Sequence, residues 1–157
     1  QTGNITPIKF RFDMACAGRL GMELQPRQMT DEERQFARRA IASYKEYRDI
    51  VMQGDLYRIG TPYDDTGYYG VMYVSKDKKK AVLFTYCTLY QSRTLVPKFR
   101  LYGLDAQTRY KIREQNVDKK RFWFDGGTFT GEYLNHAGIN PNLNKIYDSA
   151  VFVLEAE

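Results

Sequence analysis

Residues 11–24, Arg11-Phe-Asp-Met-Ala-Cys-Ala-Gly-Arg-Leu-Gly-Met-Glu-Leu24, decide the fold that this sequence predicts. Alternation of Phe10, Phe12 and Met14 predicts a strand over residues 8–17, and the glycines of the following Gly18-Arg-Leu-Gly21 suit a tight loop between a strand and a helix. A strand, a loop and then a helix are typical of a β/α unit. Because this closing unit stands where a protein should begin, and Gln1 is no initiating Met, we expect the chain to be the tail of something larger.

The segment after Met29 predicts one long amphipathic helix, about residues 31–50. Thr30 can cap it, and Glu33, three residues later, can complete a capping box. Apolar residues then follow at spacings of three and four, namely Phe36, Ala40, Tyr44, Tyr47 and Val51. The basic residues on the opposite face are expected to be solvated.

From Gly54 onward the pattern changes to short runs of β-branched and aromatic residues separated by turn residues, which is typical of antiparallel β-structure. The predicted fold class is α+β, mainly β: an antiparallel β-sandwich preceded by one strand and one long amphipathic helix. We expect two domains, residues 1–53 and residues 54–157. Seven strands are predicted, at residues 56–59, 68–75, 81–90, 98–102, 109–114, 121–124 and 149–155. The run over residues 81–87 is apolar on both faces, which predicts a central strand.

Composition excludes several classes of protein. An apolar content of 43% with 15% aromatics argues against disorder. The sequence has no apolar run near the roughly 20 residues of a membrane-spanning helix, so no membrane role is predicted, and the compartment stays unknown. The net charge of +5 is a thin excess without a nucleic-acid-binding motif, so no nucleic-acid partner is predicted.

Residues that could carry chemistry do not form a recognisable site. His136 is the only histidine, and it has neither metal-ligand spacing nor a nucleophile motif beside it. Asp13 falls in a predicted strand, whereas the adjacent Asp64 and Asp65 suit a turn, so we find no catalytic carboxylate pair. Cys16 and Cys87 are expected to be two buried thiols, with a disulfide between them left open. No metal site and no cofactor are predicted.

Several short stretches, spread over nearly the whole chain, follow one another in a characteristic order. They are Gln1-Thr-Gly3, Pro7, Arg11-Phe-Asp-Met-Ala15, Gly18-Arg-Leu-Gly-Met-Glu-Leu24, Glu32-Glu33, Ala40, Tyr44-Lys45, Arg48, Gly54-Asp-Leu-Tyr-Arg58, Pro62, Met72-Tyr-Val-Ser75, Gly103-Leu-Asp105, Tyr110, Gly131-Glu-Tyr-Leu134 and Gly138-Ile139. This order resembles the C-terminal end of bacterial α-galactosidases of glycoside hydrolase family 36. The block from Gly18 to Arg58 is the most specific part of the resemblance.

The resemblance implies that residues of about 8–52 are the last strand and helix of an eight-stranded β/α barrel, followed by an antiparallel β domain. It also implies that the two catalytic aspartates stand on earlier barrel strands. No Lys-Trp-Asp motif occurs here, and the one tryptophan is Trp123, so no residue of this chain is assigned a catalytic role.

The implied function is therefore that of a supporting segment. The parent enzyme would act on α-galactosides, and the main partner of this segment would be the missing barrel of the same chain. The loop after the predicted strand would face the mouth of the active site, which makes Ala17, Gly18, Arg19 and Gly21 candidates for the substrate rim. The sugar and its linkage stay open.

Two alternatives stay open as well. Thirteen tyrosines and Trp123 could serve a non-catalytic carbohydrate-binding module, although most aromatic residues in such a domain are expected to be core. A surface that normally faces the barrel could also act in protein interaction and pair the chain into a homo-oligomer.

Overall fold

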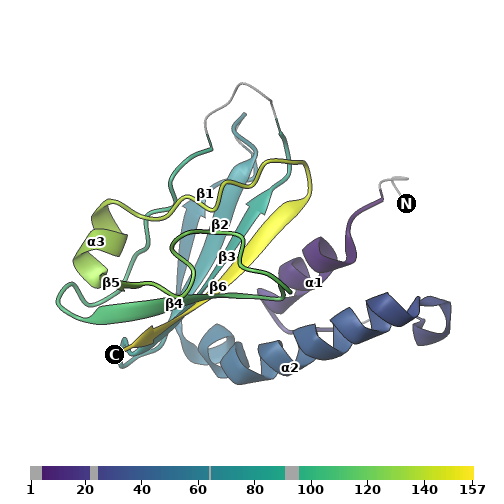
Figure 1. Ribbon diagram of the computed structural model, residues 1–157. Helices are drawn as coiled ribbons and strands as arrows, with labels where there is room; N and C mark the ends of the chain where they lie inside the picture. Colours follow the sequence, from purple (N-terminus) through teal and green to yellow (C-terminus); the bar gives the residue numbers. More distant parts are fainter. Residues whose placement is uncertain (1–4, 22–24, 64, 91–95) are drawn as a thin grey trace.

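The computed structural model describes residues 5–21, 25–63, 65–90 and 96–157, and its strands form one antiparallel sheet of six in these parts of the chain (Figure 1). The elements in chain order are α1 (Ile8–Cys16), a 3-10 turn (Pro26–Gln28), α2 (Asp31–Gln53), β1 (Asp55–Gly60), β2 (Tyr68–Val74), β3 (Lys80–Cys87), β4 (Arg109–Gln115), β5 (Thr128–Thr130), α3 (Gly131–His136) and β6 (Asp148–Ala156). The predicted α+β class with a mainly antiparallel β region is confirmed.

The order of strands in the sheet is β1-β2-β3-β6-β4-β5, so the late strand β6 lies between β3 and β4. Seven consecutive residues of β3, Ala81 to Cys87, are buried, which confirms that the doubly apolar run is a central strand. The hairpin between β2 and β3 closes where the Ser75 amide donates to the Lys80 carbonyl at 2.8 Å. Lys78 occupies a left-handed conformation in this turn.

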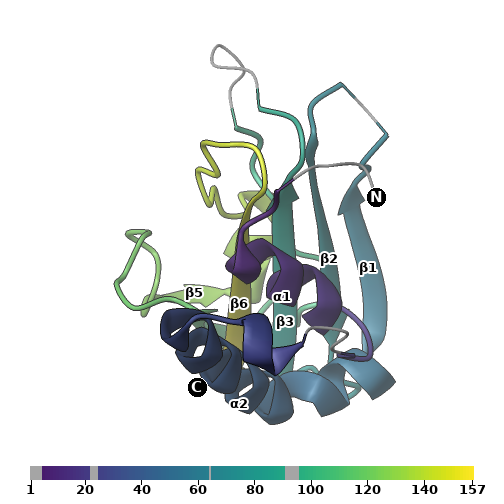
Figure 2. The same cartoon turned by 90° about the vertical axis from the view of Figure 1, so that its right-hand side faces the viewer.

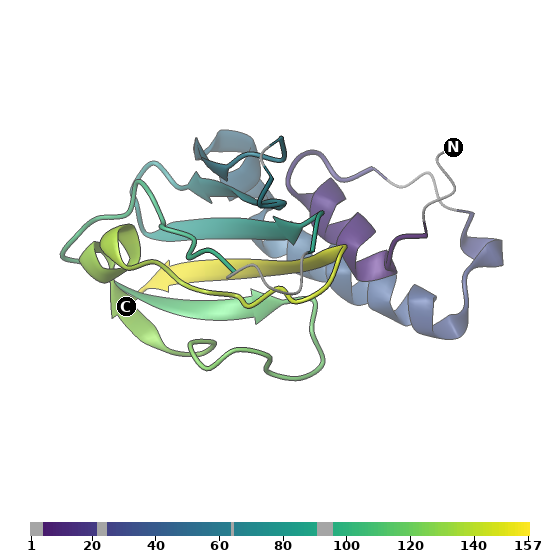
Figure 3. The same cartoon turned by 90° about the horizontal axis from the view of Figure 1, so that it is seen from above.

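Helices α1 and α2 cover one face of the sheet (Figure 2). Tyr47, Ile50 and Val51 of α2 pack with Phe84 of β3 and with Phe10 of α1 in one buried cluster. Seen from above, the first half of α2 extends past the ends of the strands (Figure 3). There it packs against α1 in a smaller cluster that includes Phe12, Ala37 and Ala40.

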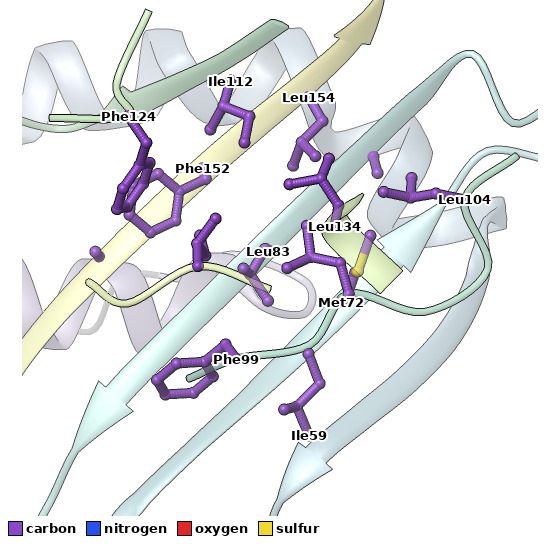
Figure 4. Packing of buried hydrophobic residues seen from close by; sticks show 14 of the residues in the cluster. Ile59, Met72, Leu83, Phe99, Leu104, Ile112, Phe124, Leu134, Phe152 and Leu154 are labelled. Atoms are coloured by element: carbon purple, nitrogen blue, oxygen red, sulfur yellow. The ribbon is translucent and has the colours of Figure 1, made fainter. Parts of the chain in front are cut away.

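The opposite face of the sheet carries the largest hydrophobic cluster, with Met72, Leu83, Ile112 and Phe152 pointing toward the covering segments (Figure 4). The residues that cover them come from irregular segments and from α3, and include Phe99, Leu104, Phe124, Leu134 and Leu143. The predicted second sheet of a sandwich is therefore replaced, in the described residues, by loops and a short helix.

Two predicted strands are wrong for a common reason. Phe99 and Leu101 point inward at strand spacing, but Phe99 makes only an isolated bridge with Ile139, and the Leu101 amide donates instead to Leu134 at 3.0 Å. Phe122 and Phe124 likewise both pack on the core, in a turn rather than a ladder. In both segments, alternating burial thus arose in backbone that belongs to no strand ladder. The short β5 was not predicted.

Residues 8–16 form helix α1, so the predicted strand over residues 8–17 is wrong. The helix packs beside α2 on the same face of the sheet, and it buries side chains toward the sheet and toward α2. The Phe10 ring contacts Tyr86 on the sheet side at 6.0 Å between centroids, whereas Phe12 contacts Phe36 of α2 at 5.7 Å. Burial at alternate residues on opposite sides of a helix imitates the period of a strand over so short a segment.

Helix α2 confirms its prediction in detail. The Thr30 hydroxyl accepts from the Glu33 amide at 3.2 Å, and the Glu33 carboxylate accepts from the Thr30 amide at 3.0 Å, which is the expected capping box. The helix ends at Gly54, where a Cβ would lie 2.5 Å from the Ile50 carbonyl oxygen and 2.7 Å from that of Val74. Only glycine allows the chain to turn this closely into β1.

Candidate functional site

The predicted rim loop contains Ala17, Gly18, Arg19 and Gly21 and follows α1. Two tyrosines form hydrogen bonds with its backbone. The Tyr73 hydroxyl of β2 donates to the Ala17 carbonyl at 2.7 Å, and the Tyr44 hydroxyl of α2 donates to the Gly18 carbonyl at 2.8 Å. Tyr44 also accepts from the Leu20 amide at 3.3 Å. The sheet and the long helix therefore both fix the backbone of this loop.

The outer side of the loop is open. The Arg19 side chain is exposed, and no ion pair joins it to any residue among those described. A Cβ at Gly18 or Gly21 would meet no atom within 4 Å, and neither glycine has a positive φ. The expectation that these glycines are needed for a tight turn is therefore not supported by the geometry within this chain. Ala17, by contrast, is half-buried against the cluster beneath the helices.

A buried carboxylate lies one turn before the loop. Asp13 has no exposed surface, and Lys9 of the same helix forms an ion pair with it. Its two oxygens also accept from the Asn116 amide at 2.9 Å and from the Ser149 hydroxyl at 2.7 Å. The carboxylate thus joins α1 to the end of β4 and to β6.

The Lys9 ammonium also donates to the Ser149 carbonyl at 2.9 Å, and this carbonyl links the Asp13 group to a second polar group. Arg121 donates to the same Ser149 carbonyl at 2.6 Å, to Asp148 at 3.1 Å and, through its Nε, to Glu114 at 2.8 Å. These contacts connect seven residues into one set, which we call the junction network. Its members are Lys9, Asp13, Asn116, Ser149, Arg121, Glu114 and Asp148.

Burial raises the pKa of Glu114, and the neighbouring guanidinium of Arg121 offsets part of this rise. Its second oxygen, Oε2, is buried without a hydrogen-bond partner in the described residues. Burial lowers the pKa of Arg121, but the hydrogen bonds and negative charges of Glu114 and Asp148 together outweigh that effect and raise the pKa overall. The arginine is therefore charged at every pH at which the protein is folded.

This arrangement suits a structural role better than acid/base catalysis. Each acid of the junction network accepts a hydrogen bond from Lys9 or Arg121, so none of these carboxylates is free to act as a nucleophile. Asp65 is exposed, and Asp64 lies outside the described residues. His136 is exposed at the last turn of α3, away from any group of potential metal ligands, of which the described residues contain none.

The two cysteines are free and buried, and they belong to clusters on opposite faces of the sheet. The disulfide that the sequence left open is absent from the structure. Burial raises the pKa of Cys16 to about 11 and also raises the pKa of Cys87. Both thiols are therefore protonated and unreactive at neutral pH.

Sequence reasoning brought Ala17, Gly18, Arg19 and Gly21 into one loop but missed the junction network. Its members are spread from Lys9 to Ser149, and no local motif connects them. The one available signal was Asp13 itself, an aspartate between the apolar residues Phe12 and Met14. Among the described helices, none combines the length and the apolar character that crossing a bilayer requires.

Comparison with known proteins places this geometry in a family. Residues 68–154 match the profile described as "Glycosyl hydrolase family 36 C-terminal domain", and residues 1–54 match the profile "Melibiase". Alpha-galactosidase 2 of Hypocrea jecorina is 32% identical over the full chain, which spans 20% of that protein.

Solved structures agree over the whole chain. The GH36 alpha-galactosidase AgaA from Geobacillus stearothermophilus superimposes with a TM-score of 0.87 at 27% identity, and all of this chain corresponds to 20% of that one. The galactosidase domain of the alpha-galactosidase-sucrose kinase AgaSK gives a TM-score of 0.86 at 28% identity, with the same coverage. The chain thus spans about a fifth of the length of these relatives, and from its profile match and its fold it belongs to glycosyl hydrolase family 36.

Proposed function

We propose that this chain is the C-terminal part of a longer α-galactosidase, in which it supports the catalytic barrel and performs no catalysis itself. The observation that carries the proposal is that the whole chain superimposes on one fifth of an α-galactosidase. The junction network supports it too, because Asp13, Glu114 and Asp148 are all engaged in ion pairs.

The parent would remove terminal α-linked galactose through a covalent glycosyl-enzyme intermediate, with retention of configuration. Variants of the related Geobacillus stearothermophilus enzyme have been crystallised with raffinose and with stachyose. We therefore infer that the parent acts on α-galactoside oligosaccharides of this kind.

We further propose the division into two units, residues 1–53 and residues 54–157. The two profile matches support it, because one ends at residue 54 and the other begins at residue 68. The first unit would complete the barrel, and the second would brace it. The junction network would hold the two together, since Asp13 belongs to the first unit and Asn116 and Ser149 to the second.

Assaying the isolated 157-residue chain beside the longer parent, with p-nitrophenyl α-galactoside, tests the supporting role. We expect hydrolysis by the parent and none above the buffer rate by the chain alone. Turnover by the isolated chain that persists through repurification would show that it holds a catalytic site of its own.

We also propose that Ala17, Gly18, Arg19 and Gly21 contribute to the rim of the parent's active site. The fixed backbone of this loop and its open outer side support the assignment. Gly18 and Gly21 have room for a Cβ within this chain, so we infer that substrate or the rest of the parent lies close to them.

The test compares two exposed arginines in the parent enzyme. Arg19→Ala is expected to raise the KM for raffinose severalfold with little change in kcat, whereas Arg38→Ala, on the solvated side of α2, should change neither. Gly18→Ala should leave the stability of the 157-residue chain unchanged but weaken raffinose binding by the parent. An Arg19→Ala enzyme with an unaltered KM would remove this residue from the rim.

A further inference from the structure

A pocket lies far along the chain from the rim loop. It has a volume of about 450 Å³, which is within the usual range for small-molecule sites. Two segments line it, residues 121–123 before β5 and residues 140–148 leading into β6. Both segments run over the face of the sheet that carries the large hydrophobic cluster (Figure 1).

Trp123 forms an exposed aromatic wall of this pocket. It is 74% exposed, although its neighbour Phe124 is buried in the core. The indole stands nearly perpendicular to the rings of Phe124 and Phe129, each at 5.8 Å between centroids. Two edge contacts thus hold the ring in a fixed orientation and leave most of it in contact with solvent, so binding a ligand there would cost little side-chain entropy.

The rest of the lining is polar and rich in amides. Asn140, Asn142 and Asn144 all line the pocket. Asn140 accepts from the Asn142 backbone amide at 2.8 Å and donates to the Val96 carbonyl at 3.3 Å, so its orientation is fixed. The Asn142 and Asn144 side chains are exposed and make no hydrogen bond with a described residue, so their amides are available to a ligand as both donors and acceptors.

The charges around the pocket nearly cancel. Arg121 and Lys145 supply two positive charges, and Asp148, with Glu114 behind Arg121, supplies two negative ones. Arg121 is already engaged by both carboxylates, so it is not free to hold an anion. The site therefore favours a neutral ligand rich in hydroxyl groups over a phosphate or a carboxylate.

We propose that this pocket binds one pyranose unit of a neutral oligosaccharide. The C–H face of the sugar ring packs on the Trp123 indole, and the amides of Asn142 and Asn144 bond its hydroxyl groups. Such a site would retain an oligosaccharide on the protein.

The first experiment uses the indole of Trp123 as its own probe, because this is the only tryptophan in the 157-residue sequence. Raffinose is titrated into the ¹⁵N-labelled chain, and the single indole N–H signal is followed by NMR. This choice of sugar depends on the proposed function, so methyl glucoside and lactose are titrated in parallel. We expect a saturable shift with a Kd in the millimolar range for at least one of them, and none with inorganic phosphate.

The second experiment is calorimetric and uses matched variants. Trp123→Ala and Asn144→Ala are expected to weaken sugar binding, the former by about tenfold or more. Tyr63→Ala removes an aromatic side chain that is 94% exposed outside the pocket, so its affinity should equal that of the unchanged chain. Circular dichroism checks that each variant is folded, which we expect because Trp123 and Asn144 are both exposed.

Three results would overturn the proposal. One is an indole signal that none of the sugars shifts, and another is equal sugar affinity in the Trp123→Ala and Tyr63→Ala variants. The third is an indole signal that shifts with protein concentration in the absence of sugar and no longer responds to it, because the pocket would then be a contact between copies of the chain. Since none of these readouts involves catalysis, their failure leaves the proposed function of the parent untouched.

Discussion

The Asp13 side chain connects three elements of the structure. Its carboxylate joins α1 to β6 and to the end of β4 in an environment without solvent exposure. A buried ion pair adds little net stability when it is complete, but breaking it is costly because the remaining charge has no partner. The effect of a substitution therefore depends on whether it leaves a buried charge without a partner.

Replacing Asp13 by Asn should leave the Lys9 ammonium without its ion-pair partner, beside a neutral amide. We expect the free energy of unfolding to fall by about 3 kcal/mol, measured by urea denaturation. Asp55→Asn serves as the control, because it breaks the exposed ion pair with Lys76 and should cost less than about 1 kcal/mol. Equal effects of the two substitutions would mean that the junction network is not a structural centre.

Cys16 predicts a loss of stability at alkaline pH. Its pKa rises from 9.0 to about 11 on folding, so the fold favours the neutral thiol. This contribution is complete below pH 9 and is lost as the pH rises through 11, because the unfolded chain then releases a proton that the folded chain retains. The expected loss is about 2 kcal/mol.

Unfolding free energies of the unchanged chain and of Cys16→Ala, measured from pH 8 to pH 11, check this effect. The difference between the two proteins should be constant up to pH 9 and should shrink above it. A constant difference over the whole range would contradict the raised pKa of this thiol.

At the scale of elements, the contribution of the α2 capping box to stability can be tested directly. Thr30→Ala removes the side chain that accepts from the Glu33 amide and should lower the free energy of unfolding by about 1 kcal/mol. Gln35→Ala, at an exposed position one turn later, should change it by less than about 0.5 kcal/mol. Thermal unfolding of the two variants side by side checks this, and a larger loss for Gln35→Ala would contradict it.

Elements with complete local signals were predictable from the sequence. Helix α2 has a cap, a regular apolar stripe and a terminal glycine, and β3 is apolar on both faces. Helix α1 was not predictable, because its burial is divided between the sheet and α2 and so lacks a single stripe. Segments 98–102 and 121–124 have the alternation of strands, but tertiary contacts, rather than their own residues, decide whether a partner strand is available.

The candidate sites were likewise predictable only where their residues are neighbours in the sequence. The rim loop is continuous in sequence, so its four residues could be grouped from the sequence alone. The pocket beside Trp123 combines residues 121–123 with residues 140–148, and only the folded chain brings these segments together. Sequence reasoning noted the tryptophan but could not predict the asparagines that line the same pocket.

For the whole molecule, the helical layer is expected to differ in stability along its length. The second half of α2 packs on the sheet through Tyr47, Ile50 and Val51, whereas the first half packs on α1 beyond the ends of the strands (Figure 3). Fewer buried contacts mean that the first half opens at a lower free energy.

Hydrogen exchange on the 157-residue chain can measure this difference. Amides of residues 36–41 should exchange faster than those of residues 47–52, and the gap should narrow in the longer parent if its remaining part covers the first half of α2. Uniform protection along α2 in the isolated chain would contradict the expected gradient.

The position of β6 also bears on the order in which the chain can fold during synthesis. A ribosome delivers β1, β2 and β3 early, and they can pair as they emerge, but β4 has no neighbour on the β3 side until β6 arrives between them. Translation thus leaves one edge of β3 and one edge of β4 unpaired until β6 has been made. A nascent chain stalled before Asp148 would therefore expose two strand edges with unpaired backbone N–H and C=O groups. We expect chaperones to bind such a chain.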